Sequence, residues 1–164
     1  MNWIPEAMIE IAAGVAIALI LRRFVCLFAV VKGSSMRDTL RNRDVLFVLR
    51  RGVCGCLRRF DVVVCRYPNR RQMFVKRIVA LPGERVAIEG GVLRIDGAPV
   101  EESFAHRPNR RDMLERKLGA GEYFVMGDNR PSSRDSRSVG PIAEGMILGV
   151  AKLVVFPPRR IKKL

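Results

Sequence analysis

The sequence contains very little histidine and few aromatic residues. His106 is the only histidine among 164 residues, so a serine–histidine triad is excluded unless this one residue supplies the base. Aromatic residues make up 7% of the chain, against 49% for all hydrophobic residues, and we therefore expect a mainly aliphatic core. The length suits one domain with a substantial core and leaves little for a second.

Cysteine is also scarce, and its four positions give no metal pattern. Cys54 and Cys56 form a C-x-C, but no second pair and no histidine at ligand spacing follow. The sequence therefore predicts no metal site. A disulfide that involves Cys65 stays open, because it depends on whether this part of the chain faces an oxidising compartment.

Acidic residues are outnumbered by basic ones, 16 to 30, which gives a net charge of +14 at pH 7. Such an excess suggests a polyanionic partner, either nucleic acid or the anionic surface of a membrane. For any single pair of arginines, a solvent-exposed face without a binding partner is an equally good explanation.

The uncharged part of the N-terminal hydrophobic run is shorter than a typical membrane span. Residues 3–21 are apolar and compatible with a helix, but two glutamates interrupt them, and the uncharged part covers about half of the roughly 20 residues of a membrane span. The start lacks the basic residues and the cleavage site of a signal peptide. We expect residues 1–23 to form a retained membrane anchor helix, extended by residues 24–31; a buried helix is the alternative.

After this run the hydrophobic period becomes that of β-strands, with turn residues between the runs. Strands are predicted at 44–49, 61–67, 73–81, 85–100 (two short runs, with the hairpin pair Asp96-Gly97), 122–126 and 146–156. Residues 101–118 lack clean periodicity and are interpreted as a surface insertion or a short helix, and the basic tail is placed on the surface. The pattern predicts a mainly β, antiparallel, partly barrel-like domain over residues 24–164.

Three polar stretches could carry chemistry. Residues 31–40 (VKGSSMRDTL) place Ser34 and Ser35 behind Gly33, where glycine lets another backbone approach closely. A serine hydroxyl is a poor nucleophile at neutral pH and needs a base from elsewhere. A polar turn after a membrane segment is the structural alternative.

Lys76 is the candidate base. It lies in the middle of the strand FVKRIVAL, on the face opposite Val75 and Arg77. If that face is inward, desolvation lowers the pKa of the amine, and a neutral lysine can accept a proton from serine. A lysine that snorkels from an edge strand is the alternative.

The third stretch, GDNRPSSRDSRSVG at residues 127–140, follows an apolar strand. Such a loop can orient a neutral lysine through a hydroxyl and brace itself with Asp–Arg pairs, and a solvated polar loop is the alternative. Its carboxylates lack the spacing of a calcium loop.

In this order, the three stretches resemble the signature boxes of type I signal peptidases, membrane-bound serine proteases with a Ser/Lys dyad. Residues 35–40 match S-M-x-P-T-L except at Asp38, residues 74–84 match F/Y-V/I-K-R-x-x-x-L-P-G-D/E, and residues 127–137 match G-D-N-R-x-x-S-x-D-S-R. The intermediate R-x-D box is present at residues 59–61. The resemblance covers residues 31–140 and implies a signal peptidase type of β-domain with an N-terminal anchor.

The resemblance also implies a role for each matched residue. Ser35 would be the nucleophile and Lys76 the general base, with the Ser35 backbone N–H in the oxyanion hole, where one donor is worth roughly 3 kcal/mol in other hydrolases. The supporting residues would be Ser133, bonded to the lysine amine, and two ion pairs, Asp135 with Arg137 and Asp128 with Arg77.

Two positions depart from the family pattern. Asp38 replaces the proline of the first box, which removes a rigid φ and adds a negative charge near Ser35. Gly33 stands where some relatives place a hydroxyl as a second oxyanion donor, and Ser34 is the candidate substitute. These departures bear on catalytic efficiency rather than on catalytic identity.

The implied reaction is hydrolysis of one peptide bond in a preprotein through an acyl-enzyme, without a cofactor. The signal peptide would add a strand beside the chain entering Ser35 and the strand carrying Lys76, and pockets lined by Met36, Leu40 and Val75 would accept small side chains.

The implied partners are preprotein signal peptides and membrane phospholipid, not nucleic acid. Because preproteins are cut as they emerge, the domain of this single-pass protein is expected on the extracytoplasmic side, although the positive-inside rule favours the opposite orientation.

Two other readings remain at this point. A LexA-like self-cleaving repressor would also use a Ser/Lys pair, but it requires a helix-turn-helix domain for which residues 1–31 are too short and too apolar. A non-enzymatic, membrane-tethered β-domain that binds lipid or nucleic acid through its arginines would lose binding with added salt.

Overall fold

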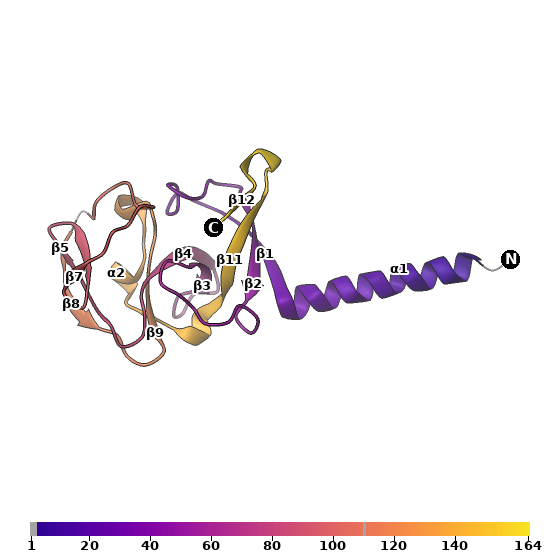
Figure 1. Ribbon diagram of the computed structural model, residues 1–164, viewed down its shortest axis with the longest axis horizontal. Helices are drawn as coiled ribbons and strands as arrows, with labels where there is room; N and C mark the ends of the chain where they lie inside the picture. The colour runs from indigo at the N-terminus through magenta and orange to yellow at the C-terminus, as the bar shows by residue number, and fades with distance from the viewer. Residues whose placement is uncertain (1–2, 110) are drawn as a thin grey trace.

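The structure, a computed structural model, describes residues 3–109 and 111–164. A long helix, α1 (Trp3–Ile20), is followed by one π-helical turn, η1 (Leu21–Val25), and projects away from a β-domain (Figure 1). Side chains 7–20 are exposed along this helix. Within the described ranges, no helix combines the length and the apolar character that crossing a membrane requires.

The β-domain consists of two antiparallel sheets. In chain order the strands are β1 (Cys26–Val30), β2 (Val45–Arg50), β3 (Val62–Arg66), β4 (Met73–Ala80), β5 (Arg85–Glu89), β6 (Val92–Ile95), β7 (Ala98–Pro99), β8 (Met113–Lys117), β9 (Glu122–Met126), β10 (Ile142–Ala143), β11 (Ile147–Phe156) and β12 (Lys162–Lys163). The larger, curled sheet has the order β1-β2-β11-β3-β4-β9-β10, with β12 paired to β11, and the smaller sheet has the order β7-β6-β5-β8. The predicted mainly β, antiparallel fold with a preceding helix is confirmed.

Hydrophobic side chains, mainly aliphatic, fill the interior in three clusters. One of them contains Met36 and Leu40, which are 2% and 1% exposed and pin the turn after β1 to the strands beneath it. Another joins the two sheets through residues such as Val79 on β4, Leu93 on β6 and Phe124 on β9. The turn that carries Ser34 and Ser35 is therefore fixed from below by apolar packing.

The hairpin between β6 and β7 follows the predicted turn chemistry. Asp96 and Gly97 have φ values of 50° and 81°, and Ile95 pairs with Ala98 across the turn. Positive φ at both central residues is the requirement of a two-residue hairpin turn, and Asp-Gly meets it at low cost.

Two segments differ from the sequence prediction. Residues 24–31, expected to extend the anchor, contain β1, which pairs with β2 from Cys26↔Leu49 to Val30↔Val45. The expected surface insertion at 101–118 contains β8, which pairs with β5. Strand β8 is mostly exposed, so backbone pairing rather than side-chain burial creates it, and its sequence shows no hydrophobic alternation.

Candidate active site

Ser35 and Lys76 meet although they are 41 positions apart in the chain. Ser35 lies in the turn between β1 and β2, and Lys76 lies in the middle of β4, opposite Val63 of β3. The Nζ of Lys76 donates to Ser35 Oγ at 2.7 Å and to Ser133 Oγ at 3.2 Å. The structure therefore brings together the predicted nucleophile, base and supporting hydroxyl.

Lys76 is 3% exposed. Burial lowers the pKa of its amine below the usual lysine value, while Asp135, Cys65 and Asp128 act in the opposite direction and Arg137 adds to the lowering. Removal of water is the dominant cause, because a buried ammonium loses its hydration. A share of neutral amine is the form that can take a proton from a hydroxyl.

The catalytic loop, defined here as residues 127–137, is held by two Asp–Arg pairs. Arg77 Nε and Nη2 donate to the two oxygens of Asp128 at 2.9 and 2.7 Å, with Asp128 fully buried. Arg137 makes the same two-pronged contact with Asp135, at 2.8 Å for each nitrogen. Burial alone would raise the pKa of Asp135, but hydrogen bonds from Arg137 and from the Gly127 N–H lower it overall.

Gly127 lets the catalytic loop approach the Ser35 turn. A Cβ at this position would lie 2.2 Å from Ser133 Oγ and 2.5 Å from the carbonyl oxygen of Ser35. Both distances are far inside van der Waals contact, so only glycine fits here without moving Ser133 or the Ser35 backbone.

Two further residues hold the Ser35 turn, and the sequence reading gave neither of them a role. Asn129 donates from its backbone N–H to the Ser35 carbonyl and from its side chain to the Ser34 carbonyl, both at 3.0 Å. Thr39 donates to Asp128 and accepts from Arg77 at 3.1 Å. Both lie inside matched boxes, and that position was the available signal.

A cleft of about 740 Å³ opens beside Ser35. Predicted binding residues Gly33, Ser34, Met36 and Val75 line it. Its other lining residues, apart from Ser35 and Lys76, are Ala29, Val30, Val31, Lys32, Val64, Gln72, Met73, Phe74, Ser132 and Arg134. Leu40 does not line this cleft; it is buried and borders a neighbouring hollow.

Of the other candidate polar residues, Ser34 contacts the catalytic loop and His106 does not line the cleft. The Ser34 hydroxyl lies 3.4 Å from the Ser132 hydroxyl, so Ser34 is linked to the catalytic loop. His106 is exposed in the segment that precedes β8, and it is not among the residues that line the cleft.

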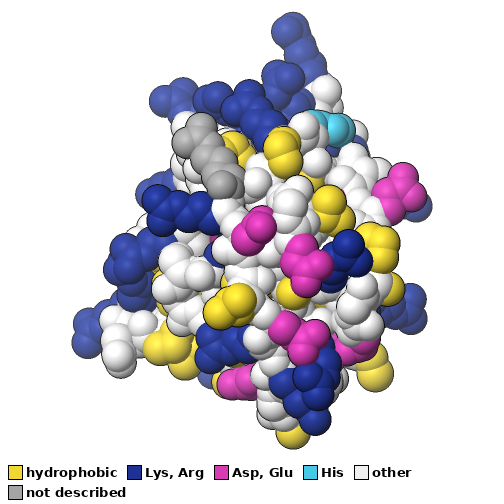
Figure 2. Space-filling model, turned by 90° about the vertical axis from the view of Figure 1, so that its left-hand side faces the viewer, with side chains coloured by type: hydrophobic (Ala, Val, Ile, Leu, Met, Phe, Trp, Pro, Cys, Tyr) yellow, Lys and Arg dark blue, Asp and Glu magenta, His cyan; other side chains and the backbone are white. Residues whose placement is uncertain are grey.

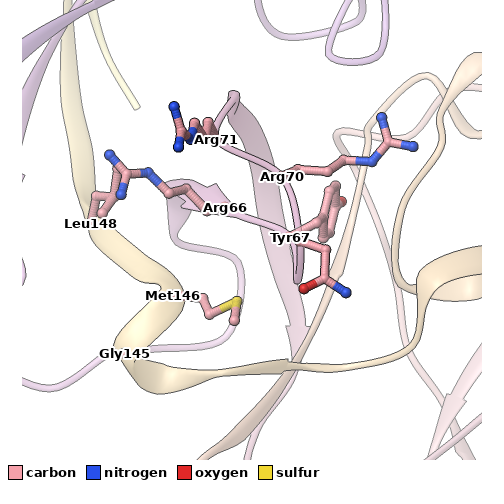
Figure 3. Close-up of a pocket in the computed structure, with 8 residues that line it drawn as sticks. Arg66, Tyr67, Arg70, Arg71, Gly145, Met146 and Leu148 are labelled. Atoms are coloured by element: carbon pink, nitrogen blue, oxygen red, sulfur yellow. The ribbon is translucent and has the colours of Figure 1, made fainter.

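An arginine-lined hollow of about 490 Å³ lies at the end of the β3–β4 hairpin. It contains none of the predicted site residues. Figure 3 shows that Arg66 extends toward Leu148 while Arg70 extends to the other side. These two guanidinium groups therefore do not converge on a single anion.

Comparisons with known proteins agree on one family. A family model described as "Signal peptidase, peptidase S26" matches residues 3–156. Signal peptidase I T of Bacillus subtilis (strain 168) is 36% identical over 159 residues, covering 90% of this chain and 82% of the relative. Signal peptidase I of Bacillus licheniformis is 33% identical over 174 residues, covering 99% and 94%.

A solved structure gives the same result. The crystal structure of a signal peptidase I from Enterococcus faecalis V583 matches with a TM-score of 0.54 and 29% identity. The match covers 58% of this chain and 97% of the other.

Proposed function

The chain belongs to the signal peptidase family, peptidase S26, and we propose that it removes signal peptides from preproteins through a dyad of Ser35 and Lys76. Membership makes it a serine hydrolase of the signal peptidase I type. The observation that carries the proposed dyad is the 2.7 Å distance between Lys76 Nζ and Ser35 Oγ at a buried position.

In the proposed mechanism Lys76 acts first as base and then as acid. The neutral amine takes the hydroxyl proton while Ser35 Oγ attacks the carbonyl carbon of the scissile bond. The Ser35 backbone N–H donates to the resulting oxyanion. Collapse breaks the C–N bond, and the Lys76 ammonium gives its proton to the leaving amine.

The acyl-enzyme is then hydrolysed with Lys76 as base again. Water attacks the ester carbonyl, the amine takes a proton from that water, and the proton returns to Ser35 Oγ as the signal peptide leaves. Ser133 accepts from the amine at 3.2 Å, which keeps the nitrogen directed at Ser35 through both steps.

The substrate strand would add to β1, which forms one edge of the larger sheet and contributes to the cleft. An edge strand leaves backbone groups unpaired, and an extended peptide can use them. Met36, Val75 and neighbouring small apolar residues line the cleft, which favours small side chains before the scissile bond.

We also propose that α1 anchors the chain to the cytoplasmic membrane, with the β-domain on the outer face and phospholipid as a partner. The supporting observation is the row of exposed apolar side chains on α1, including Ile9, Ile11 and Ile17. A reporter that is active only outside the cytoplasm, fused to the C-terminus, tests the orientation. An inactive reporter would reverse this placement.

The dyad is tested by preprotein cleavage in detergent with the full chain. Ser35→Ala and Lys76→Met are each expected to lower kcat by at least about 10³-fold, because either change removes a step of the acyl transfer. Lys152→Met, at a half-exposed lysine, is a matched control and should cleave normally. If preproteins are still cleaved after either Ser35→Ala or Lys76→Met, the proposed dyad is wrong.

A further inference from the structure

One segment contacts three arginines that hold the catalytic loop. Residues 101–109, named here the clamp segment, lie between β7 and β8 and carry Glu102, Phe104 and Asn109. Their partners are respectively Arg130, Arg77 and Arg137. Each arginine belongs to the proposed catalytic machinery, whereas the clamp segment belongs to none of the family boxes.

The first contact is a buried, two-pronged ion pair. Arg130 Nη1 donates to Glu102 Oε2 at 2.6 Å and Nη2 donates to the other oxygen. The Arg130 side chain is 1% exposed and that of Glu102 is 11% exposed. Arg130 Nε donates in turn to the Gly127 carbonyl at 3.0 Å, so the pair fixes the residue that packs against Ser35.

The second contact is a cation–π interaction. The Arg77 guanidinium carbon lies 4.0 Å from the centre of the Phe104 ring, and Phe60 packs edge-on against the same ring at 5.0 Å. Such contacts strengthen when the cation is desolvated. Because Arg77 also holds Asp128, Phe104 covers the ion pair that anchors the start of the catalytic loop.

The third contact uses both ends of one amide. The side-chain oxygen of Asn109 accepts from Arg137 at 3.2 Å, and its nitrogen donates to the Gly91 carbonyl at 2.9 Å. Arg137 also donates to the Ser133 carbonyl at 3.4 Å. Asn109 thus links the smaller sheet to the backbone of the residue that contacts Lys76.

We propose that the clamp segment is a positioning element of the active site, and that Glu102 is its main positioning residue. It holds the catalytic loop in the conformation that places Gly127 against Ser35 and Ser133 against Lys76. Glu102 matters most because its removal leaves the buried Arg130 guanidinium without a counter-charge, which favours displacement of the loop. This inference rests on the proposed function of Ser35 and Lys76.

The main test compares Glu102→Gln with Glu115→Gln in the full chain, using a signal-sequence peptide as substrate. Glu115 pairs with Arg85 at an exposed position on the same small sheet, so it is a matched control away from the catalytic loop. We expect Glu102→Gln to lower kcat on the order of tenfold with little change in KM, because the reacting groups are misplaced rather than the substrate-binding strand. Glu115→Gln should match wild type.

The pH profile separates positioning from a general loss of folded protein. Lys76 must be neutral to act as base, so kcat/KM rises with pH through its pKa. Loosening the loop admits water and returns that pKa toward the ordinary value, which moves the acidic limb of Glu102→Gln to higher pH. The charged or titratable groups around Lys76 are Asp135, Cys65, Arg137 and Asp128, and the substitution leaves all four in place.

Phe104→Leu is the second variant, because it removes the ring without leaving a buried charge. Compared with Glu102→Gln, it should show a smaller fall in kcat and a smaller shift of the acidic limb of the pH profile, both in the same direction. Wild-type kcat and an unmoved limb in Glu102→Gln, or in Phe104→Leu if Glu102→Gln does not fold, would overturn the inference. Ser35→Ala assayed in parallel distinguishes the cases: if it is inactive while the clamp variants behave as wild type, only the clamp inference fails.

Discussion

Lys76 lies on β4 with 3% of its surface exposed, and its burial has a consequence for stability. Its pKa is lower in the folded protein than in the unfolded chain, so the unfolded chain binds more protons at pH values between the two pKa values. Stability therefore rises with pH from the folded pKa up to the ordinary lysine value of about 10.4. Below that window the folded state bears the full desolvation cost of the ammonium.

Lys76→Met should consequently stabilise the protein at neutral pH while abolishing cleavage. Methionine fills a similar volume without a charge, and we expect a gain of roughly 1 kcal/mol. The gain should shrink as pH rises toward and past about 10.4, above which the wild-type amine is neutral in both states. Urea unfolding at neutral and alkaline pH measures it, and a variant less stable than wild type at neutral pH contradicts this account.

Asp38 occupies the family's proline position, and its Oδ2 is buried without a hydrogen-bond partner within residues 3–109 and 111–164. No hydrogen bond from its backbone N–H occurs among these residues either. Proline at this position would lose no such bond and would restrict the unfolded chain.

Asp38→Pro is therefore expected to stabilise the protein by roughly 0.5–1 kcal/mol. Turnover should be equal to or above that of wild type, because Ser35 keeps its contacts to Asn129 and Lys76. Thermal unfolding and a cleavage assay measure the two effects. A destabilised Asp38→Pro would mean that the backbone at this turn is incompatible with proline.

At the scale of elements, the C-terminal tail holds the segment that follows Ser35. Arg160, in the turn η4 (Pro158–Arg160), donates to both oxygens of Asp44 at 2.8 and 2.9 Å. Lys162 on β12 donates to the Thr39 carbonyl at 2.8 Å. Burial would raise the pKa of Asp44, but the hydrogen bonds from Arg160 and from the Arg41 N–H lower it overall.

Arg160→Ala should destabilise the protein by roughly 2 kcal/mol at neutral pH, since it leaves a buried carboxylate without its partner. A carboxyl with a lowered folded pKa contributes stability above its unfolded pKa of about 3.9, and this contribution is lost as pH falls through the folded value. The difference from wild type should therefore narrow below about pH 3.9. Arg159→Ala, at the exposed neighbouring residue, is the control. Equal stability of Arg160→Ala and wild type at neutral pH would show that the pair contributes nothing.

The elements also show what could be read from the sequence. Strands β3, β4 and β9 were predicted from their runs of β-branched or apolar residues, and most of these residues are buried. Strands β1 and β8 were not, because β1 follows the N-terminal apolar run after only two arginines and β8 exposes most of its side chains. In both cases pairing with a distant strand decides the structure, and a local pattern carries no information about such pairing.

The residues of the candidate site were easier to predict from the sequence than strands β1 and β8. Ser35, Lys76 and Ser133 lie within matched boxes, and the structure places them within hydrogen-bonding distance. The contributions of Glu102 and Asn109 could not be foreseen, because a charged segment without periodicity gives no sign of the buried arginines it will meet. Leu40 shows the converse, since an apolar residue in a site motif can serve the core instead of the cleft.

At the scale of the whole molecule, the charge and the exposed apolar helix lie on different parts. Figure 2 shows the end of the domain opposite α1, with Lys and Arg side chains along its upper and left-hand margins. The +14 net charge attracts anionic surfaces, and this attraction is screened by salt. The apolar side chains of α1 would instead bind the hydrocarbon region, and this contribution is insensitive to salt.

The two contributions can be separated by flotation of the full chain with lipid vesicles. Wild type should bind zwitterionic vesicles at high salt through α1, and bind anionic vesicles more tightly at low salt. Ile11→Asp combined with Ile17→Asp places two charges on exposed positions of α1. Each costs about 2.5–3.5 kcal/mol in a membrane, so binding to zwitterionic vesicles should fall by at least roughly 100-fold.

Binding of this double variant to anionic vesicles at low salt should persist, because its net charge of +12 (14 − 2) stays strongly positive, and it should disappear at high salt. Leu114→Asp, at an exposed position on β8, adds a charge outside α1 and should leave binding to zwitterionic vesicles unchanged. If the double variant still binds zwitterionic vesicles as wild type does, α1 is not the membrane-binding element. The exposed apolar side chains would then require a protein partner.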